Sequence, residues 1–259
     1  MKIEFYKYQG TGNDFVMIDN RDLHFPKEDV SFINQLCDRK FGIGADGLIL
    51  LENDENADFR MVYYNADGNQ STMCGNGGRC IVKFAYDLGI IDKKTSFYAI
   101  DGKHYAEIID DKISLQMIDV VDIKVIDNEN IFLNTGSPHH IQLVQDIATT
   151  DVYKLGKNIR YSSLYHPVGT NVNFVQKVGN NNFEIRTYER GVEDETLSCG
   201  TGATAVAIGM HYLGMADNEC VNIEVQGGEL IVRFKKINDS YSEVFLQGPA
   251  TYVFKGLWG

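Results

Sequence analysis

The sequence MCGNGG at Met73–Gly78 returns 125 residues later as SCGTGA at Ser198–Ala203. A strand-like run precedes each stretch, at residues 59–64 and 183–188, and a helical run follows each of them. Both helical runs end at a Leu-Gly pair, and a glycine just after the last helical residue commonly stops a helix. The repeated order of strand, turn and helix predicts an internal duplication, with one domain built from each half of the chain.

A second pair of similar stretches lies at a longer interval. It consists of GTGNDFV at Gly10–Val16 and GTNVNFV at Gly169–Val175. The difference between the two intervals predicts an additional structural element in the first half. Residues 96–108 and 221–232, which follow the two helical runs, have the alternating pattern of a β-hairpin.

The two helical runs differ in polarity. The run after Cys199 is apolar on nearly every side, so we expect it to be buried on most sides. In the run after Cys74, Arg79, Lys83 and Asp87 recur at intervals of four residues and predict one solvent-facing stripe. A strongly curved sheet wrapped around one central helix is the simplest architecture that fits each half.

We therefore predict an α/β fold of two pseudo-symmetric domains, each a curved, mostly antiparallel sheet around a central helix. The first domain covers residues 1–120 and carries Cys74. The second covers residues 121–249 and carries Cys199. The alternative is a single domain in which two glycine-rich turns resemble each other by chance.

The composition is that of an ordinary globular protein: 44% of the residues are hydrophobic, 23% are charged and four are prolines. The formal net charge of −12 and the lack of a Lys/Arg cluster argue against nucleic acids and anionic membranes as partners. The longest nearly apolar stretch, residues 203–210, is far shorter than the ~20 residues of a membrane span. The first seven residues alternate like a strand and contain no apolar signal-peptide core, so we expect the mature protein to begin here.

Five cysteines without a CxxC pair do not form the pattern of a disulfide framework, and the chain contains no HExxH zinc motif. A reducing compartment, the cytoplasm, fits this cysteine usage best. We expect Cys37, Cys80 and Cys220 to be buried and chemically inert.

Cys74 and Cys199 each lie at or just before the start of a predicted helix. Unpaired backbone N–H groups and the positive end of the helix dipole favour a thiolate over a thiol at such a position. A dipole contribution of about 1–2 kcal/mol lowers an ordinary thiol pKa of about 8.5 to about 7–8. The glycines that follow let a ligand approach the backbone amides closely, so the two helix starts together can also bind a carboxylate.

If a pseudo-twofold axis relates the two halves, we expect the two cysteines to face each other across the cleft between the domains. Two opposed acid–base groups suit a reaction that removes a proton from one face of a carbon atom and adds a proton to the other. We expect one thiolate and one thiol, because two thiolates in one site repel each other. A disulfide between them is the alternative, which a reducing compartment disfavours.

Eight motifs along the chain resemble those of diaminopimelate epimerases, the pyridoxal-phosphate-independent enzymes of lysine and cell-wall synthesis. They are GTGNDF at 10–15, GIGADG at 42–47, YNADG at 64–68, MCGNGGRC at 73–80, SPH at 137–139, TNVNF at 170–174, ERGVEDET at 189–196 and CGTGA at 199–203. The resemblance implies two similar α/β domains, with a strand at residues 250–259 that returns to the first. It also implies an isomerase that epimerises LL-2,6-diaminopimelate to the meso isomer with two cysteines and without cofactor or metal.

By this resemblance Cys74 and Cys199 are the acid–base pair, and the direction of the reaction decides which of them is the base. His139 and Glu189 would support the ionisation of the cysteines. The first turns of the two helices would hold the α-carboxylate of the substrate, through Gly75, Asn76, Gly200 and Thr201. The rest of the substrate would contact Asn13, Asn65, Asn173, Glu189 and Arg190, of which the guanidinium suits bidentate binding of a second carboxylate.

Two positions depart from the family. Some members carry glutamine where this chain has Gly47, and many carry asparagine where it has Ser137. A water molecule can replace the amide that Gly47 lacks, whereas the Ser137 hydroxyl keeps part of the hydrogen-bonding capacity of an asparagine. Both departures concern substrate binding and leave the acid–base chemistry in place.

The nearest alternative is a racemase of the same architecture that acts on proline, hydroxyproline or histidine. Arg190 with Asn65 and Asn173 favours a substrate with a second polar head, which proline lacks. A cysteine hydrolase would leave one thiol unused, and a non-catalytic metabolite-binding protein would need neither. The expected partner is a small-molecule amino acid rather than a nucleic acid or a membrane, and a homodimer is left open.

Overall fold

The computed structural model describes residues 2–259, which divide into two compact units. Unit 1 contains the residues up to Leu115 together with Gly248–Gly259, and unit 2 is Gln116–Gln247. The boundaries expected from sequence lie after residues 120 and 249. Residues 116–120 join unit 2 because the Met117 N–H donates to the Val244 carbonyl oxygen at 2.8 Å and because Val120 pairs with Tyr241.

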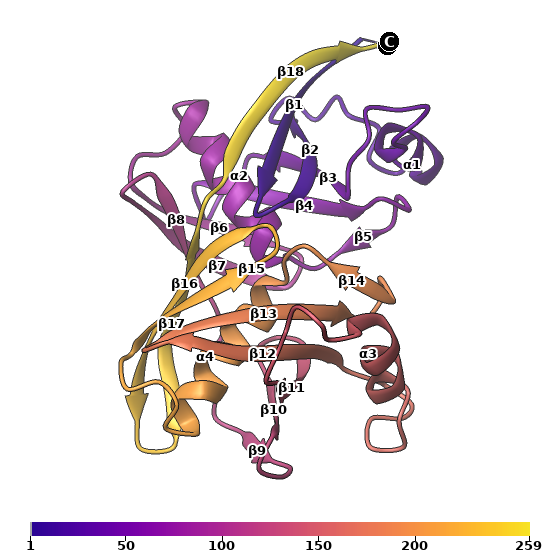
Figure 1. Ribbon diagram of the computed structural model, residues 1–259. Helices are drawn as coiled ribbons and strands as arrows, with labels where there is room; N and C mark the ends of the chain where they lie inside the picture. Colours follow the sequence, from indigo (N-terminus) through magenta and orange to yellow (C-terminus); the bar gives the residue numbers. More distant parts are fainter. Residues whose placement is uncertain (1) are drawn as a thin grey trace. The chain divides into compact units, whose positions relative to one another are not determined.

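Unit 1 is a curved sheet with helix α2 (Gly75–Asp87) against one face and helix α1 (Val30–Cys37) against the other (Figure 1). Its strands are β1 (Ile3–Gly10), β2 (Asn13–Asp19), β3 (Gly47–Glu52), β4 (Phe59–Asn65), β5 (Gln70–Ser71), β6 (Lys94–Ala99), β7 (Gly102–Ile109), β8 (Lys112–Gln116) and β18 (Thr251–Trp258). Their order is β18-β1-β2-β3-β4-β6-β7-β8, and β5 pairs with the end of β4. Neighbours are antiparallel except β2–β3 and β4–β6, which are parallel.

Unit 2 has the same plan, with helix α4 (Gly200–Tyr212) inside the curved sheet and helix α3 (Val152–Arg160) outside it. Its strands are β9 (Ile123–Val125), β10 (Asn130–Asn134), β11 (Pro138–Leu143), β12 (Asn171–Gly179), β13 (Asn182–Glu189), β14 (Asp194–Thr196), β15 (Cys220–Val225), β16 (Gly228–Ile237) and β17 (Ser240–Gly248). Their order is β9-β10-β11-β12-β13-β15-β16-β17, with parallel pairs β11–β12 and β13–β15, and β14 pairs with β13.

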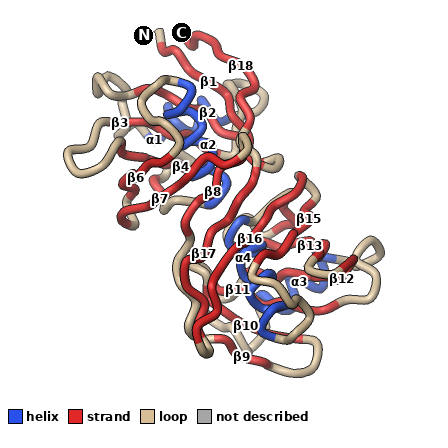
Figure 2. Tube along the Cα trace, turned by 90° about the vertical axis from the view of Figure 1, so that its left-hand side faces the viewer, coloured by secondary structure: helices blue, strands red, loops and turns tan. Residues whose placement is uncertain are grey.

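The predicted fold class is confirmed: each unit is a mostly antiparallel sheet around one helix (Figure 2). The second sequence similarity, however, does not mark equivalent positions. Asn13 begins β2 and Pro138 begins β11, the same interval of 125 residues that separates the two central helices. GTGNDFV leads into β2, whereas GTNVNFV leads into β12, the counterpart of β3. In both stretches a turn that contains glycine precedes a buried strand. The same local structure requires similar residues, and this explains the similarity of the two sequences.

In each unit one helix packs on each face of the sheet, so that apolar residues are buried on both faces. Every residue of β3 is buried. Leu48 and Leu50 of this strand belong to the apolar cluster that includes Ile33 of α1. The alternate residue Ile49 points to the other face, where a Cβ atom on Gly77 of α2 would lie 3.1 Å from its side chain. Glycine at this position therefore lets α2 pack closely on the strand.

The two central helices end as predicted, since Gly89 and Gly214 follow the last turns and both have a φ of +71°. Helix α4 is buried as expected, from Gly200 to Met210 with the exception of Thr201. Helix α4 is apolar but contains only 13 residues. Within residues 2–259 no helix combines the length and the apolar character that crossing a membrane requires.

One prediction for α2 is wrong. Lys83 and Asp87 of the expected solvent-facing stripe do pair with each other at the surface, but Arg79 is fully buried. The guanidinium of Arg79 points back along the helix and donates to the carbonyl oxygens of Gly75 and Pro249. Pro249 is so distant in sequence that the spacing of polar residues could not indicate this burial.

Candidate active site

Cys74 is the N-cap residue of α2. Its backbone is extended, with φ −104° and ψ 150°, and its Sγ accepts a hydrogen bond from the backbone N–H of Gly77 at 3.2 Å. The side chain is partly exposed. A backbone donor and the positive end of the helix both favour the thiolate here, as the sequence predicts.

Cys199 is the N-cap residue of α4 and is buried. Its Sγ lies 3.5 Å from the hydroxyl oxygen of Thr201, and no side-chain hydrogen bond caps the helix. A Cβ atom on Gly202 would lie 2.4 Å from Oδ1 of Asn173 and 3.3 Å from Sγ of Cys199. The first turn of α4 therefore brings Cys199, Thr201 and Asn173 together, and Gly202 has to be a glycine.

Asn13 and Asn76 form a hydrogen-bonded pair in unit 1. Nδ2 of Asn76 donates to Oδ1 of Asn13 at 3.3 Å. Nδ2 of Asn13 in turn donates to the carboxylate of Asp46, and Oδ1 of Asn76 accepts from Arg79 at 3.0 Å. These partners define both amide orientations, because a carboxylate only accepts and a guanidinium only donates. The amide nitrogen is therefore the donor side of each of these two residues.

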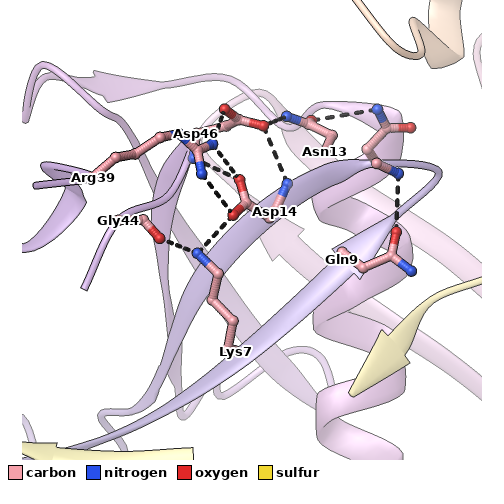
Figure 3. Close-up of polar contacts among 9 residues, drawn as sticks. Lys7, Gln9, Asn13, Asp14, Arg39, Gly44 and Asp46 are labelled. Carbon is pink, nitrogen blue, oxygen red and sulfur yellow. Dashed lines mark hydrogen bonds and ion pairs between the residues drawn. The ribbon is translucent and has the colours of Figure 1, made fainter. Parts of the chain in front are cut away.

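Asp46 belongs to a cluster of charged side chains that orients Asn13 (Figure 3). Arg39 donates to Asp46 at 2.7 Å and to the two carboxylate oxygens of Asp14 at 2.6 and 3.1 Å. Lys7 forms a further ion pair with Asp14 at 2.8 Å. Burial opposes the ionisation of Asp14, but the hydrogen bonds from Arg39 and Lys7 outweigh it and lower the pKa of Asp14 to about 2. Asp14 is therefore ionised at neutral pH. Sequence reasoning missed it, although Asp14 and Asp46 both lie in the quoted motifs.

Asn65 ends β4 with an exposed side chain, and it pairs with Gly47 of β3. A Cβ atom on Gly47 would lie 2.5 Å from the carbonyl oxygen of Tyr64 and 2.6 Å from the ring of Tyr63. Tyr63 and Asn65 are two residues apart in one strand, so they share a face of the sheet. The side chain of Tyr63 therefore lies where a glutamine at position 47 would begin, and sequence reasoning, which expected a water molecule, missed it.

His139 and Asn173 are fully buried on the parallel strands β11 and β12. Nδ2 of Asn173 donates to Nδ1 of His139 at 3.1 Å and to the carbonyl oxygen of His140 at 3.1 Å, while its Oδ1 accepts from Thr187 at 3.0 Å. These bonds assign the proton of the neutral imidazole to Nε2. Within residues 2–259, Nε2 of His139 has no hydrogen-bond partner. It is therefore a buried donor that a ligand can engage.

His139 is uncharged at neutral pH. Burial, and to a smaller extent the positive charge of Arg190, lowers the pKa of His139 to about 3. The imidazole can therefore assist a thiolate through a hydrogen bond but not through a positive charge. Because both amide hydrogens of Asn173 are used by the two histidines, this side chain holds His139 in place and keeps only its oxygen for other contacts.

Glu189 ends β13, and Arg190 follows it. Oε2 of Glu189 accepts from the hydroxyl of Thr196 at 2.9 Å. The Arg190 guanidinium reaches the carbonyl oxygen of Val168 at 3.5 Å, and no carboxylate of residues 2–259 forms an ion pair with it. The two neighbours therefore do not form a surface ion pair with each other. A half-buried guanidinium without a carboxylate suits an anionic ligand.

Ser137 is linked to Arg190 through Asn171, a residue that sequence reasoning missed within the TNVNF motif. Nδ2 of Asn171 donates to Oγ of Ser137 at 2.9 Å, and its Oδ1 accepts from the backbone N–H of Arg190 at 2.8 Å. The hydroxyl oxygen of Ser137 thus accepts a hydrogen bond from Asn171, and Asn171 in turn binds the backbone of Arg190. These contacts give the serine at position 137 a hydrogen-bonding role next to Arg190.

The other three cysteines are Cys37, Cys80 and Cys220. Burial raises the pKa of Cys37 and of Cys80 to about 12, which agrees with the expectation that both are inert. The expectation that Cys220 is buried is wrong: it is exposed, because Val221 and Ile223 take the inward positions of β15. Within residues 2–259 there is no disulfide and no group of His, Cys, Asp and Glu side chains arranged to bind a metal.

Known proteins resemble this chain over nearly its whole length. The family profile described as diaminopimelate epimerase matches residues 5–121 and 131–253. The chain is 59% identical over 254 residues to the diaminopimelate epimerase of Flavobacterium psychrophilum, covering 98% of this chain and 99% of that protein. It is 41% identical to that of Aquifex aeolicus, with 98% and 97% coverage.

Solved structures share the fold at low sequence identity. A PhzF-family phenazine biosynthesis protein of Bacillus anthracis superposes with a TM-score of 0.78 at 14% identity, covering 100% of this chain and 99% of that one. A hydroxyproline epimerase of Agrobacterium vitis gives a TM-score of 0.68 at 14% identity, with 99% and 92% coverage. These two likenesses concern the fold alone. The family profile and the full-length relatives carry the assignment: the chain belongs to the diaminopimelate epimerase family.

Proposed function

We propose that this chain interconverts LL-2,6-diaminopimelate and meso-2,6-diaminopimelate, with Cys74 and Cys199 as acid and base. One observation carries the proposal. In a chain of this family, the two cysteines occupy the same N-cap position in two units of equal topology. Relatives that bear the name diaminopimelate epimerase match nearly the full length, which supports this substrate over other amino acids.

The proposed reaction needs one thiolate and one thiol. The thiolate removes the proton from the α-carbon, and the thiol of the other cysteine delivers a proton to the opposite face, so the two cysteines exchange protonation states in each turnover. The intermediate places negative charge on the α-carboxylate. Backbone N–H groups at the two helix starts, at Gly75, Asn76, Gly200 and Thr201, are suited to stabilise this charge.

Substrate binding is proposed to use donors of both units. Asn13, oriented by Asp46, and Asn65, exposed at the end of β4, would bind polar atoms of the substrate. Arg190, which forms no ion pair with a carboxylate of residues 2–259, would bind the distal carboxylate. This second anionic head is the feature that separates diaminopimelate from proline and hydroxyproline.

His139 and Glu189 are proposed to support the cysteines. The Nε2–H of the neutral His139, which has no partner among residues 2–259, is a hydrogen-bond donor that suits a thiolate or a substrate oxygen. Glu189, held by Thr196, carries the acceptor that an ammonium group of the substrate or a thiol would need. Asn173 is proposed to act mainly by holding His139, since its amide hydrogens already have partners.

The direct test is a stereochemical assay. Purified protein is incubated with LL-2,6-diaminopimelate without added pyridoxal phosphate or metal, and the isomers are separated and quantified. We expect the meso isomer, and we expect Cys74→Ala and Cys199→Ala each to lower the rate by about 100-fold or more, as loss of an acid–base group does. Cys220→Ala, which removes an exposed cysteine of β15, is the matched control and should keep the parent rate.

Absence of meso product would overturn the substrate assignment. Parallel incubations with L-proline, trans-4-hydroxy-L-proline and L-histidine then test a racemase of the same architecture. A metabolite-binding protein would instead keep its affinity for the ligand in both cysteine variants and show no turnover. Residence in the cytoplasm and assembly into a homodimer are consistent with this function and stay predictions.

A further inference from the structure

The guanidinium of Arg79 is fully buried beneath the first turn of α2. It donates to the carbonyl oxygens of Pro249 at 3.3 Å and Gly75 at 3.2 Å, to the hydroxyl of Thr11 at 3.1 Å and to Oδ1 of Asn76 at 3.0 Å. All four acceptors are neutral, and no carboxylate of residues 2–259 forms an ion pair with Arg79. Burial lowers the pKa of Arg79 to about 10, which still leaves it charged at neutral pH.

A buried charge without a counter-ion strongly favours a negative group beside it. Two side chains near Arg79 can become negative, the thiols of Cys80 and Cys74. Cys80 is fully buried, and burial raises its pKa to about 12, so it stays neutral. Cys74 is partly exposed, lies at the helix start and directly precedes Gly75, whose carbonyl oxygen binds Arg79. Cys74 is therefore the group that can supply the missing negative charge.

The same place in unit 2 is neutral. Thr204 stands 125 residues after Arg79 and is also fully buried. Its hydroxyl donates to the carbonyl oxygen of Gly200 at 3.0 Å, just as Arg79 donates to that of Gly75. The two helix starts thus share one hydrogen bond. In unit 1 this bond comes from a full positive charge, and in unit 2 it comes from an uncharged group.

We propose that Arg79 makes the two cysteines unequal before any substrate binds, with Cys74 as the thiolate and Cys199 as the thiol. The inference rests on the proposed function in taking these cysteines as the acid–base pair, but the ionisation order itself needs no substrate. Arg79 is a positioning residue, since it acts through Cys74 and through Asn76, whose amide it orients.

Other charged groups around α2 do not reverse this order. On β2, Asp14 is already paired with Lys7 and Arg39. Asp101 accepts from the backbone N–H of Met73 at 3.3 Å, but it lies at the surface, where water screens its charge. Tyr6, Tyr8, Lys83 and Asp87 lie toward the last turns of α2. Asp19 of β2 and Glu52 of β3 are paired with Arg21 and Lys27.

No Lys or Arg side chain of residues 116–247 is buried, so α4 has no counterpart of the buried positive charge of Arg79. Strand β11 contributes His139 and His140, which are both neutral at pH 7. Strand β13 ends with Glu189, whose carboxylate accepts from Thr196, and the following Arg190 is partly exposed to water. His211 lies in the last turn of α4, far from Cys199 along the helix. Strands β10, β15 and β16 turn apolar side chains inward.

The experiment measures the ionisation of each cysteine in the wild-type protein. Iodoacetamide reacts with thiolates, so the pH at which the alkylation rate is half-maximal reports the ionisation of each thiol. Peptide mapping by mass spectrometry separates the five cysteines. The midpoint, unlike the maximal rate, does not depend on how accessible a cysteine is. We expect the midpoint of Cys74 to lie at least about one pH unit below that of Cys199. A lower midpoint for Cys199, or equal midpoints, would overturn the proposal.

Variants of Arg79 test the cause. Arg79→Met should raise the midpoint of Cys74 by about one pH unit or more and slow its alkylation at pH 7 about tenfold, while Cys199 stays unchanged. Arg79→Lys keeps the charge and should restore most of the difference. Thr204→Val, the matched control, removes the equivalent hydrogen bond without a change of charge and should move neither midpoint by more than a few tenths of a pH unit.

An unchanged Cys74 midpoint in a folded Arg79→Met protein would overturn the role of Arg79. If that variant does not fold, Arg79→Lys and the wild-type profile decide, because the order of the two midpoints is measured without it. Failure of the stereochemical assay with LL-2,6-diaminopimelate would count against the proposed substrate only. The alkylation profile contains no substrate, so the two failures can be told apart.

Discussion

Asn13 illustrates how residues outside a site decide what the site can bind. Nδ2 of Asn13 donates to Asp46, which fixes the orientation of the amide, and Asp46 is held in turn by Arg39. Rotation of the amide by 180° would offer an oxygen instead, which repels a carboxylate. The orientation of Asn13 therefore depends on charged side chains that need not contact the ligand.

Replacing Asp46 with alanine tests this dependence. One lost orienting hydrogen bond corresponds to about 1–1.5 kcal/mol, so we expect kcat/KM for LL-2,6-diaminopimelate to fall about tenfold, mainly through KM. Asp19→Ala, which removes a partly exposed carboxylate paired with Arg21 at 2.7 Å, is the matched control and should change kcat/KM less than about twofold. Equal losses in both variants would mean that overall charge, and not the orientation of Asn13, sets the affinity.

Gly47 provides a second test at the scale of one residue. A methyl group there meets the carbonyl oxygen of Tyr64 at 2.5 Å, which backbone atoms cannot easily relieve. We expect Gly47→Ala to lower the free energy of unfolding by about 1–3 kcal/mol in urea titrations. Gly179→Ala in β12 is the control, because its Cβ would meet only the flexible side chain of Asn182. A Gly47→Ala variant as stable as the control would show that β4 can shift to make room.

At the scale of elements, β11 carries two neutral imidazoles in the interior of unit 2. Burial lowers the pKa of His139 to about 3 and that of His140 to about 4. His140 is further held by the hydroxyl of Tyr165 at 2.7 Å and by Oδ1 of Asn130 at 3.0 Å. In the unfolded chain both side chains take up a proton near pH 6.5, whereas in the folded chain they do not.

This difference predicts loss of stability in mild acid. Below about pH 6.5 the unfolded state binds more protons, so each histidine lowers the free energy of unfolding by up to about 1.4 kcal/mol per pH unit, until the pH approaches the folded-state pKa. Urea titrations at pH 7.5, 6 and 5 measure the slope. His140→Asn should reduce it, whereas His24→Asn, at an exposed position, is the matched control. A slope that His140→Asn leaves unchanged would contradict the assignment.

The central helices show what a sequence pattern can predict at this scale. The Cys-Gly-x-Gly turns, the helix stops at Gly89 and Gly214 and the paired hairpins depend on local chemistry, and the structure has all of them where they were expected. The similarity between Gly10–Val16 and Gly169–Val175 misled because two non-equivalent strands begin with the same kind of turn. The local sequence predicts that a turn forms, but it does not predict which position in the sheet the following strand takes.

Side chains whose partners come from distant segments could not be predicted. Arg79 has the spacing of a surface residue, and only the carbonyl oxygen of Pro249 and the hydroxyl of Thr11 explain its burial. The charged cluster around Asp46 joins three separate segments of unit 1 in the same way. The candidate residues themselves were recognised from motifs, whereas the contacts that orient them required the fold.

At the scale of the whole molecule, the proposed mechanism needs one cysteine from each unit, and isotopes can follow the two protons. In D2O, starting from the pure LL isomer, the meso product should carry deuterium from the first turnover, because it receives its proton from a cysteine that has exchanged with solvent. The recovered LL isomer should keep its hydrogen at low conversion, because return from the first thiol restores the original proton. Mass spectrometry of the separated isomers measures both.

Two results would contradict this arrangement. Extensive early deuteration of the LL isomer would point to one rapidly exchanging base. Hydrogen retained in the meso product would point to one group that carries the proton from face to face. The matched control is Cys220→Ala, which should give the same labelling as the parent protein.

Strand β18 has a consequence for how the chain is made. It pairs antiparallel with β1, and the neighbouring Pro249 supplies an acceptor for the buried guanidinium of Arg79, so unit 1 is incomplete until its last strand arrives. Unit 2 is contiguous in the chain and can close as soon as it leaves the ribosome. At roughly 5–20 residues per second, translation of Gln116–Gln247 takes about 7–26 seconds. Throughout that time the edge of β1 is open to strands of other nascent chains, although most of unit 1 emerges before unit 2.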